Sequence, residues 1–267
     1  MGRKVIVFIP LLFLFVFGFS QSSRPISLEK AIPKSQNHIQ YIDHKYFKLG
    51  YVEKHEQAQW VAYVLTKTMV ENNNVKRHSS FAQDKKIITQ SASNKDYKNS
   101  GYDKGHLCPA GDMNWDAKAM KATFLLSNIS PQDPSFNRGI WKKLEEKARD
   151  WAVENDSIII ITGPVLKEII TSIGENQVSV PCYFYKIIID ISPPDYKAIG
   201  FIIENTSSNL DLRNFSFSIR EIESFTDLNF FHKYDKDDFI ERLETSINLS
   251  DWNLKNEKNR KETKKSR

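Results

Sequence analysis

Apolar and polar residues alternate along this chain in patterns that predict both helices and strands. Apolar residues at helical spacing predict an amphipathic helix over residues 57–70, and further helices over residues 116–126 and 137–153. The apolar side of the first predicted helix consists of Trp60, Val61, Val64, Leu65 and Met69. Short helices are also expected after Asp211, towards the end of the chain.

Short runs of β-branched and aromatic residues predict strands in the second half. The run Ser157–Thr162 reads Ser-Ile-Ile-Ile-Ile-Thr and is closed by Gly163-Pro164, which is typical of a buried strand. Residues 178–189 and 197–203 predict two more strands.

Two shorter segments precede these strands. Residues 102–108 predict a short strand that is interrupted by Gly105. Residues 128–134 contain two prolines and an aspartate, and so predict a turn.

The predicted elements follow one another without regular strand–helix–strand alternation. This order favours an α+β fold with a mixed, largely antiparallel sheet flanked by helices. Residues 41–250 contain no repeat and no linker rich in Gly, Pro or Ser, so we expect one domain there. Residues 21–40 are polar and are expected to form an extended lead-in.

The first twenty residues have the pattern of a secretory signal peptide. Two basic residues precede an apolar run over residues 5–19, and the small residues Gly18 and Ser20 stand where a signal peptidase cuts. The mature chain is therefore expected to begin at Gln21 and to be exported, to a periplasm or to the extracellular space, without stable membrane association. An uncleaved N-terminal anchor is the alternative.

The net charge of +5 is concentrated at the end of the chain. Residues 251–267 are expected to be a disordered basic tail, with seven Lys or Arg and two Glu from Lys255 onwards. Residues 21–254 hold 29 basic and 31 acidic residues. A folded body of this composition can bind a polyanion only through a local cationic groove.

The segment Ser100-Gly-Tyr-Asp-Lys-Gly-His-Leu-Cys-Pro-Ala-Gly-Asp112 carries the clearest chemical signal. It places His106 directly after a flexible glycine, and about thirty residues later Asn137, Glu145 and Arg149 fall on one predicted helix. Glu145 and Arg149 are four residues apart and so share a face of that helix.

These residue types suit the hydrolysis of a phosphodiester. A neutral imidazole can accept the proton of the attacking water near pH 7. The charge that develops on the phosphate oxygens requires a hard divalent cation and guanidinium groups. Because Mg²⁺ keeps most of its waters, one Asn carbonyl can hold it if a carboxylate binds those waters.

Three motifs resemble those of the DNA/RNA non-specific endonucleases, the endonuclease G-like nucleases of the ββα-metal (His-Me finger) class. The family motifs are Asp-Arg-Gly-His, Asn-x-x-Pro-Gln and Asn-x-Gly-x-Trp-x-x-Leu-Glu. This chain has Asp103-Lys-Gly-His106, Asn128-Ile-Ser-Pro-Gln132 and Asn137-Arg-Gly-Ile-Trp-Lys-Lys-Leu-Glu145. The resemblance extends over residues 41–231 and implies a ββα-metal motif at the site.

The resemblance implies a role for each matching residue. His106 is expected to be the general base, Asn137 the direct ligand of Mg²⁺ (or Mn²⁺), and Glu145 the acid that binds the metal through water. Arg149 is expected to stabilise the transition state, and Asn128 to support the site.

Arg77, in the segment Arg77-x-x-x-Phe81-x-x-Asp84, resembles a further phosphate-binding arginine of the family. Lys104 stands where the family has arginine, so a forked phosphate contact becomes a point charge. The implied function is an exported endonuclease acting on DNA, RNA or both.

Several alternatives remain open from the residues alone. The chain could be a non-catalytic extracellular nucleic-acid-binding protein, or a phosphodiesterase for a smaller diester. Asn137 could be a helix N-cap, and Glu145 with Arg149 an ordinary surface ion pair. Cys108 could serve a Cys–His hydrolase, although the only two cysteines, Cys108 and Cys182, are expected to be buried, unpaired thiols.

Overall fold

The computed structural model describes residues 26–193, 196–234 and 237–254. The predicted signal peptide, and the tail beyond Leu254, lie outside these residues. Within them, no helix is both long enough and apolar enough to cross a membrane.

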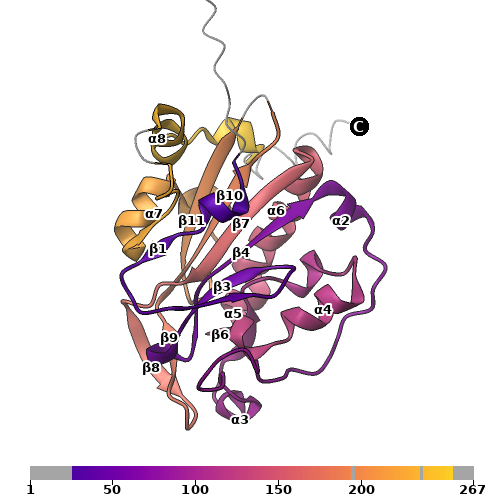
Figure 1. The fold of residues 1–267 in the computed structure, drawn as a ribbon, viewed down its shortest axis with the longest axis vertical. Helices are drawn as coiled ribbons and strands as arrows, with labels where there is room; N and C mark the ends of the chain where they lie inside the picture. Colours follow the sequence, from indigo (N-terminus) through magenta and orange to yellow (C-terminus); the bar gives the residue numbers. More distant parts are fainter. Residues whose placement is uncertain (1–25, 194–195, 235–236, 255–267) are drawn as a thin grey trace, which may run out of the picture.

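A seven-stranded sheet forms the centre of the molecule, and every neighbouring pair of its strands is antiparallel (Figure 1). The strands lie in the order β12-β11-β10-β7-β4-β3-β2. They are β2 Gln40–Asp43, β3 Lys48–Val52, β4 Gln57–Thr66, β7 Ser157–Pro164, β10 Tyr183–Asp190, β11 Lys197–Glu204 and β12 Ser216–Phe217. The predicted α+β fold with a largely antiparallel sheet is confirmed.

The sheet carries a hydrophobic core on each of its faces. In β7, Ile158 and Ile160 belong to one core, whereas Ile159 and Ile161 belong to the other, because successive side chains of a strand point to opposite faces. Helix α6 (Lys142–Glu154) covers the first face, and α1 (Leu28–Ala31), α7 (Ile219–Thr226) and α8 (Asp238–Thr245) cover the second (Figure 1).

Three two-stranded sheets and several short helices complete the described fold. The paired strands are β1 Lys34–Ser35 with β13 Leu228–Asn229, β5 Asp103–His106 with β6 Ile129–Gln132, and β8 Ile169–Ile173 with β9 Val178–Pro181. The further helices are α2 Lys67–Glu71, α3 Asn94–Tyr97, α4 Ala117–Thr123 and α5 Pro134–Phe136. The remaining turns are η1 Glu53–His55, η2 Ala110–Asp112, η3 Leu126–Asn128, η4 Asn137–Trp141, η5 Leu212–Phe215 and η6 Leu249–Trp252.

The helix predicted over residues 57–70 is wrong for most of its length. Strand β4 occupies Gln57–Thr66, and only the last residues enter α2. Because β4 is buried on both faces, its apolar residues stand next to one another and also fit a helical template. Its polar residue Gln57 is buried as well, where Nε2 donates to the carbonyl of Ser179 and Oε1 accepts from Ser130.

Two other expectations also need correction. Residues 128–134 were expected to form a turn, but β6 is a strand that pairs with β5 throughout its length. Residues 21–40 were expected to be extended, but their described part contains helix α1, whose Ala31 packs into the second core.

The two cysteines are free thiols, as expected. Cys108 is buried, but Cys182 is partly exposed, so the expectation of burial is correct for Cys108 only.

Candidate active site

Strands β5 and β6 and helix α6 form a ββα unit against the first face of the central sheet. The strands pair in the register Asp103 with Gln132 and His106 with Ile129. The chain then passes through α5 and the turn η4 directly into α6. Most of the candidate residues therefore come from one continuous stretch of the chain.

His106 lies at the end of β5 in an aromatic environment. Its ring centroid is 4.9 Å from that of Phe124 and 5.5 Å from that of Phe81, and the residue is only 8% exposed. Its Nε2 makes no hydrogen bond with any residue that the structure describes. Burial, together with the positive charge of Arg77, lowers the pKa of His106 to about 3. The imidazole is therefore neutral near pH 7 and able to accept a proton.

Asn128 fixes the backbone just beyond His106. Its Oδ1 accepts from the Cys108 amide, and its Nδ2 donates to the carbonyls of Cys108 and Thr123, each at 2.9 Å. The Leu107 amide donates to the Asn128 carbonyl, also at 2.9 Å. Because Asn128 is fully buried, these bonds hold the end of β5 in one position.

Asn137 stands at the junction between α5 and the helical segment that follows. The Asp133 side chain caps α5 by accepting from the Ser135 and Phe136 amides, and Pro134 follows the cap. Asn137 begins the wide, π-helical turn η4. Its Nδ2 donates to Asp103 Oδ2 at 2.9 Å, which leaves Oδ1 available as a ligand.

A kink separates Asn137 from Glu145. Gly139, inside the turn η4, has the non-helical dihedral angles φ −104° and ψ −110°. Asn137 therefore precedes the kink, whereas Glu145 lies beyond it in the regular helix α6.

Glu145 is partly exposed on α6 and makes no hydrogen bond within the described part of the chain. Burial raises its pKa to about 7, and the negative charge of Asp112 acts in the same direction. The positive charges of Lys186, Arg149 and Arg77 oppose this rise. A cation placed beside Glu145 would further favour its carboxylate form.

Arg149 forms an ion pair with Asp112 and no direct pair with Glu145. Its Nη1 donates to Asp112 Oδ1 at 2.7 Å. The surface ion pair between Glu145 and Arg149, which the sequence left open, is therefore not formed.

Two buried residues beneath the site, Tyr63 and Lys186, were not identified from the sequence. Tyr63 of β4 donates from its hydroxyl to Asp112 Oδ2 at 2.7 Å. Lys186 of β10 is 1% exposed, and its Nζ lies 4.7 Å from the ring centroid of Trp141 without a hydrogen-bond partner among the described residues. A lysine in the middle of an apolar strand is the one signal in the sequence that could have revealed Lys186.

Arg77 and Lys104 place positive charge at the outer side of the site. The exposed Arg77 guanidinium carbon lies 5.2 Å from the Phe124 ring centroid, and its charge lowers the pKa of both His106 and Glu145. Arg77 is thus within electrostatic range of both groups. The Lys104 ammonium lies 5.2 Å from the Phe81 ring centroid.

The chemistry of the donor groups fits a hard divalent cation. Asn137 offers an amide oxygen and Glu145 a carboxylate, which are donors that Mg²⁺ and Mn²⁺ accept. Among the described residues, no group of three or more His, Cys, Asp or Glu could hold a metal ion. An ion here would keep most of its own waters and have few protein ligands.

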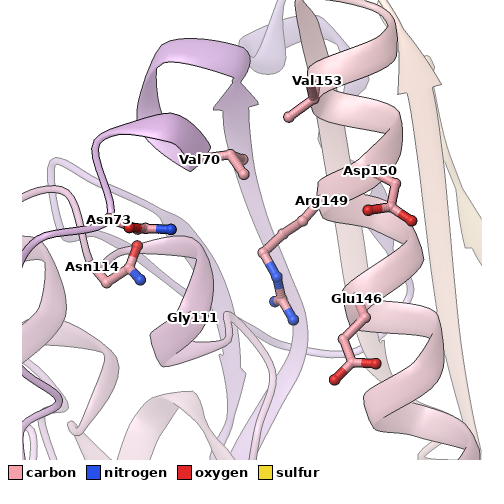
Figure 2. A pocket seen from close by; sticks show the side chains of 8 residues that line it. All are labelled: Val70, Asn73, Gly111, Asn114, Glu146, Arg149, Asp150 and Val153. Atoms are coloured by element: carbon pink, nitrogen blue, oxygen red, sulfur yellow. The ribbon is translucent and has the colours of Figure 1, made fainter.

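A pocket of about 430 Å³ opens beside Arg149 (Figure 2). Its lining consists of Val70, Asn73, Gly111, Asn114, Glu146, Arg149, Asp150 and Val153. His106 and Asn137 are not among these residues, whereas Arg149 is. In Figure 2, the Arg149 side chain extends from α6 across the pocket.

Known nucleases resemble this chain in sequence and in structure. The profile of the DNA/RNA non-specific endonuclease family matches residues 27–237. Mitochondrial nuclease EXOG from Xenopus laevis is 32% identical, over 76% of this chain and 61% of its own length. Nuclease C1 from Cunninghamella echinulata var. echinulata is 31% identical, over 73% of this chain and 84% of its own length.

The structural comparison agrees with the sequence comparison. A chain in the crystal structure of the EndoG/EndoGI complex is similar with a TM-score of 0.70 and 29% identity, over 76% of this chain and 89% of that chain. The present chain spans about three fifths of the length of mitochondrial nuclease EXOG, with 61% of the Xenopus laevis protein and 58% of the Homo sapiens protein covered.

Proposed function

Because the chain belongs to the DNA/RNA non-specific endonuclease family, we propose that it is a metal-dependent endonuclease that hydrolyses phosphodiester bonds of DNA and RNA. The observation that carries the proposal is the His106 imidazole. It is neutral, its Nε2 is free of hydrogen bonds to described residues, and it lies in the same ββα unit as Asn137. Export of the mature chain is part of the proposal and rests on the pattern of residues 1–20.

His106 acts as the general base. Its unprotonated ring nitrogen accepts a proton from the water that attacks phosphorus. The Asn128 hydrogen bonds keep the adjoining backbone in place, and the Phe81 and Phe124 rings limit the access of bulk water to the imidazole. The proton therefore passes to a base whose position is fixed before substrate binds.

Asn137 and Glu145 are the residues that would hold Mg²⁺, or Mn²⁺ in its place. Asn137 would offer Oδ1, since its Nδ2 is bonded to Asp103, and Glu145 would offer its carboxylate to the water of the ion. The ion would supply a positive charge for the charge that develops on the phosphate and leaving oxygens.

Arg149, Arg77 and Lys104 bind the phosphate groups of the substrate. Guanidinium groups suit phosphate oxygens because they donate parallel hydrogen bonds, and Lys104 adds a point charge. Contacts of this kind do not distinguish between bases. Cleavage is therefore expected to have little sequence preference and to include both DNA and RNA.

The proposal is tested by digestion of closed circular DNA and of RNA, with Mg²⁺ and with EDTA. Wild-type protein is expected to nick the circle only when the metal is present. His106→Ala is expected to lower the rate about 10²–10⁴-fold. His78→Ala is the matched control, because His78 also packs against Phe124, at 5.2 Å, and has no part in the mechanism.

Undiminished cutting in EDTA, or by the His106→Ala protein, would overturn the mechanism. Salt-sensitive binding of nucleic acid without any cleavage would indicate a binding protein instead. Cleavage of short model diesters but not of polymers would indicate a phosphodiesterase for smaller substrates.

A further inference from the structure

A buried carboxylate connects the central sheet to Arg149. Asp112 Oδ2 accepts from the Tyr63 hydroxyl, and Asp112 Oδ1 accepts from Arg149 Nη1, each at 2.7 Å. The Asp112 side chain is 1% exposed, whereas that of Arg149 is 23% exposed. The Arg149 guanidinium is thus held by a buried carboxylate, while part of the Arg149 side chain remains exposed to solvent.

Rigid elements hold each of the three residues. Tyr63 is fully buried in β4, which is paired with β3 on one side and β7 on the other. Asp112 belongs to the turn η2, close after the backbone that Asn128 fixes. Arg149 projects from the middle of α6.

Gly111 leaves space for the Arg149 guanidinium. A Cβ atom at this position would lie 3.1 Å from Arg149 Nη1, which is closer than nine in ten Cβ contacts in proteins. The absence of a side chain here lets the guanidinium lie directly against the turn that carries Asp112.

The remaining nitrogens of Arg149 are free to bind another group. Within residues 26–193, 196–234 and 237–254, Nη1 to Asp112 is the only hydrogen bond that the guanidinium makes. Arg149 also lines the pocket of Figure 2. A phosphate oxygen that approaches from that side could accept from Nη2 and Nε while Nη1 stays on Asp112.

We propose that Asp112, held by Tyr63, is a positioning residue that fixes the Arg149 guanidinium for contact with the substrate phosphate. The inference rests on the proposed nuclease function and deepens it. A long arginine side chain has many rotamers, and an anchor on one nitrogen selects one of them before substrate binds. Asp112 acts only through Arg149 and has no contact of its own with the substrate.

The positive charge of Lys186 compensates the negative charge that Asp112 places beside Arg149, so that Arg149 can still attract a phosphate. Asp112 alone would cancel the charge of Arg149 and weaken its attraction for an anion. The buried Lys186 ammonium interacts electrostatically with both Asp112 and Glu145, so two cations face two carboxylates in this region. The group carries no net negative charge that would repel the substrate.

The test is a double-mutant cycle on kcat, measured by cleavage of a fluorescent single-stranded DNA in saturating Mg²⁺. Arg149→Ala is expected to lower kcat about 10²–10³-fold, and Asp112→Asn about 10-fold or more. The double variant Asp112→Asn/Arg149→Ala should be no slower than Arg149→Ala alone, because Asp112 would have no further group to position. A merely structural role for Asp112 would instead make the two effects multiply.

Two further variants keep the test decisive. Tyr63→Phe removes only the hydroxyl that holds Asp112, and should lower kcat in the wild-type background but not in the Arg149→Ala background. Asp190→Asn removes a different buried carboxylate, which belongs to β10 and lies outside the site, and should leave kcat unchanged. Thermal unfolding of each protein shows whether it folds, and Tyr63→Phe replaces Asp112→Asn in the cycle if the latter does not.

The outcomes separate this inference from the proposed function. Failure of the wild-type protein to cleave would overturn both. Cleavage that is lost in His106→Ala, combined with multiplying effects of Asp112→Asn and Arg149→Ala, would overturn only the positioning role.

Discussion

Asn137 donates a 2.9 Å hydrogen bond to Asp103, which stands three positions before His106 in the same strand. Asp103 and His106 belong to the strand β5, so this hydrogen bond ties the proposed metal ligand to the strand that ends in the proposed base. Asn137 and His106, thirty-one positions apart in the chain, are thereby connected through one side-chain contact.

Replacement of Asn137 by alanine should remove the metal ligand without unfolding the protein. We expect Asn137→Ala to lower the rate of DNA cleavage by about 100-fold or more, and to require a higher Mg²⁺ concentration for half-maximal rate. Metal titrations of the cleavage rate measure both effects. Arg138→Ala is the matched control, because exposed Arg138 also binds Asp103, and it should leave the metal requirement nearly unchanged. Equal metal requirements for Asn137→Ala and wild type would contradict the assignment.

The stability of the protein should fall in acid partly because of His106. Its pKa of about 3 in the folded state lies below the value of about 6.5 expected when it is unfolded. Protonation of His106 therefore favours unfolding. The contribution of the neutral, buried imidazole to the free energy of unfolding is complete above pH 6.5 and is lost as the pH falls towards 3. The slope is at most about 1.4 kcal/mol per pH unit.

Urea unfolding between pH 7.5 and 4.5 measures this slope. His106→Gln should show a shallower decrease in the free energy of unfolding than wild type. His78→Ala should keep the wild-type slope. Identical slopes for His106→Gln and wild type would show that the imidazole is protonated normally in the folded protein.

Lys186 should control the pH at which the protein becomes active. Its positive charge lowers the pKa of Glu145, which burial raises to about 7. Because Glu145 must be a carboxylate to bind metal waters, activity should rise with pH through this pKa. Lys186→Met removes the opposing charge, so the pKa of Glu145 rises and the activity profile shifts to higher pH.

Rates of DNA cleavage from pH 5 to 9 test this shift. Lys197→Met is the control, because Lys197 also lies over a tryptophan ring, at 5.0 Å from the Trp252 centroid, and is not among the residues of the proposed site. Its profile should match that of wild type. An unchanged or more acidic profile for Lys186→Met would exclude the electrostatic role.

Gly105 should not tolerate even a methyl group. A Cβ atom at this position would lie 2.2 Å from the Gln132 side chain, which is buried on the paired strand β6. We expect Gly105→Ala to lower the free energy of unfolding by about 1–3 kcal/mol, as measured in urea. In a Gln132→Ala background, the same substitution should cost less, since the clashing group is absent. Equal costs in the two backgrounds would place the strain elsewhere.

The motifs of the sequence group the proposed site residues that lie close together along the chain. The structure brings His106, Asn128 and Asn137 into one ββα unit, as the order of these motifs indicates. Helix α6 was also predicted, because its apolar residues form one stripe against the sheet.

The buried partners of the site could not be predicted in the same way. Tyr63 and Asp112 are hydrogen-bonded although they lie 49 positions apart in the chain. Tyr63 also belongs to β4, whose apolar pattern predicted a helix because the strand is buried on both faces. Lys186 acquires its role only when β10 is packed under α6. Such contacts depend on how strands are ordered in the sheet, which periodicity along one segment does not reveal.

The alternation of side chains along β10 has a consequence for folding. In the native register, Lys186 is opposite Thr162 of β7 and Phe201 of β11, on the face that carries Asp112 and Glu145. A slip by one residue would turn the ammonium into the apolar layer around Trp60 and Ile159, where no carboxylate of the site could reach it. A single lysine thus makes neighbouring registers of the central strands unfavourable, so the charge that serves the site also helps the chain to reject mispaired sheets.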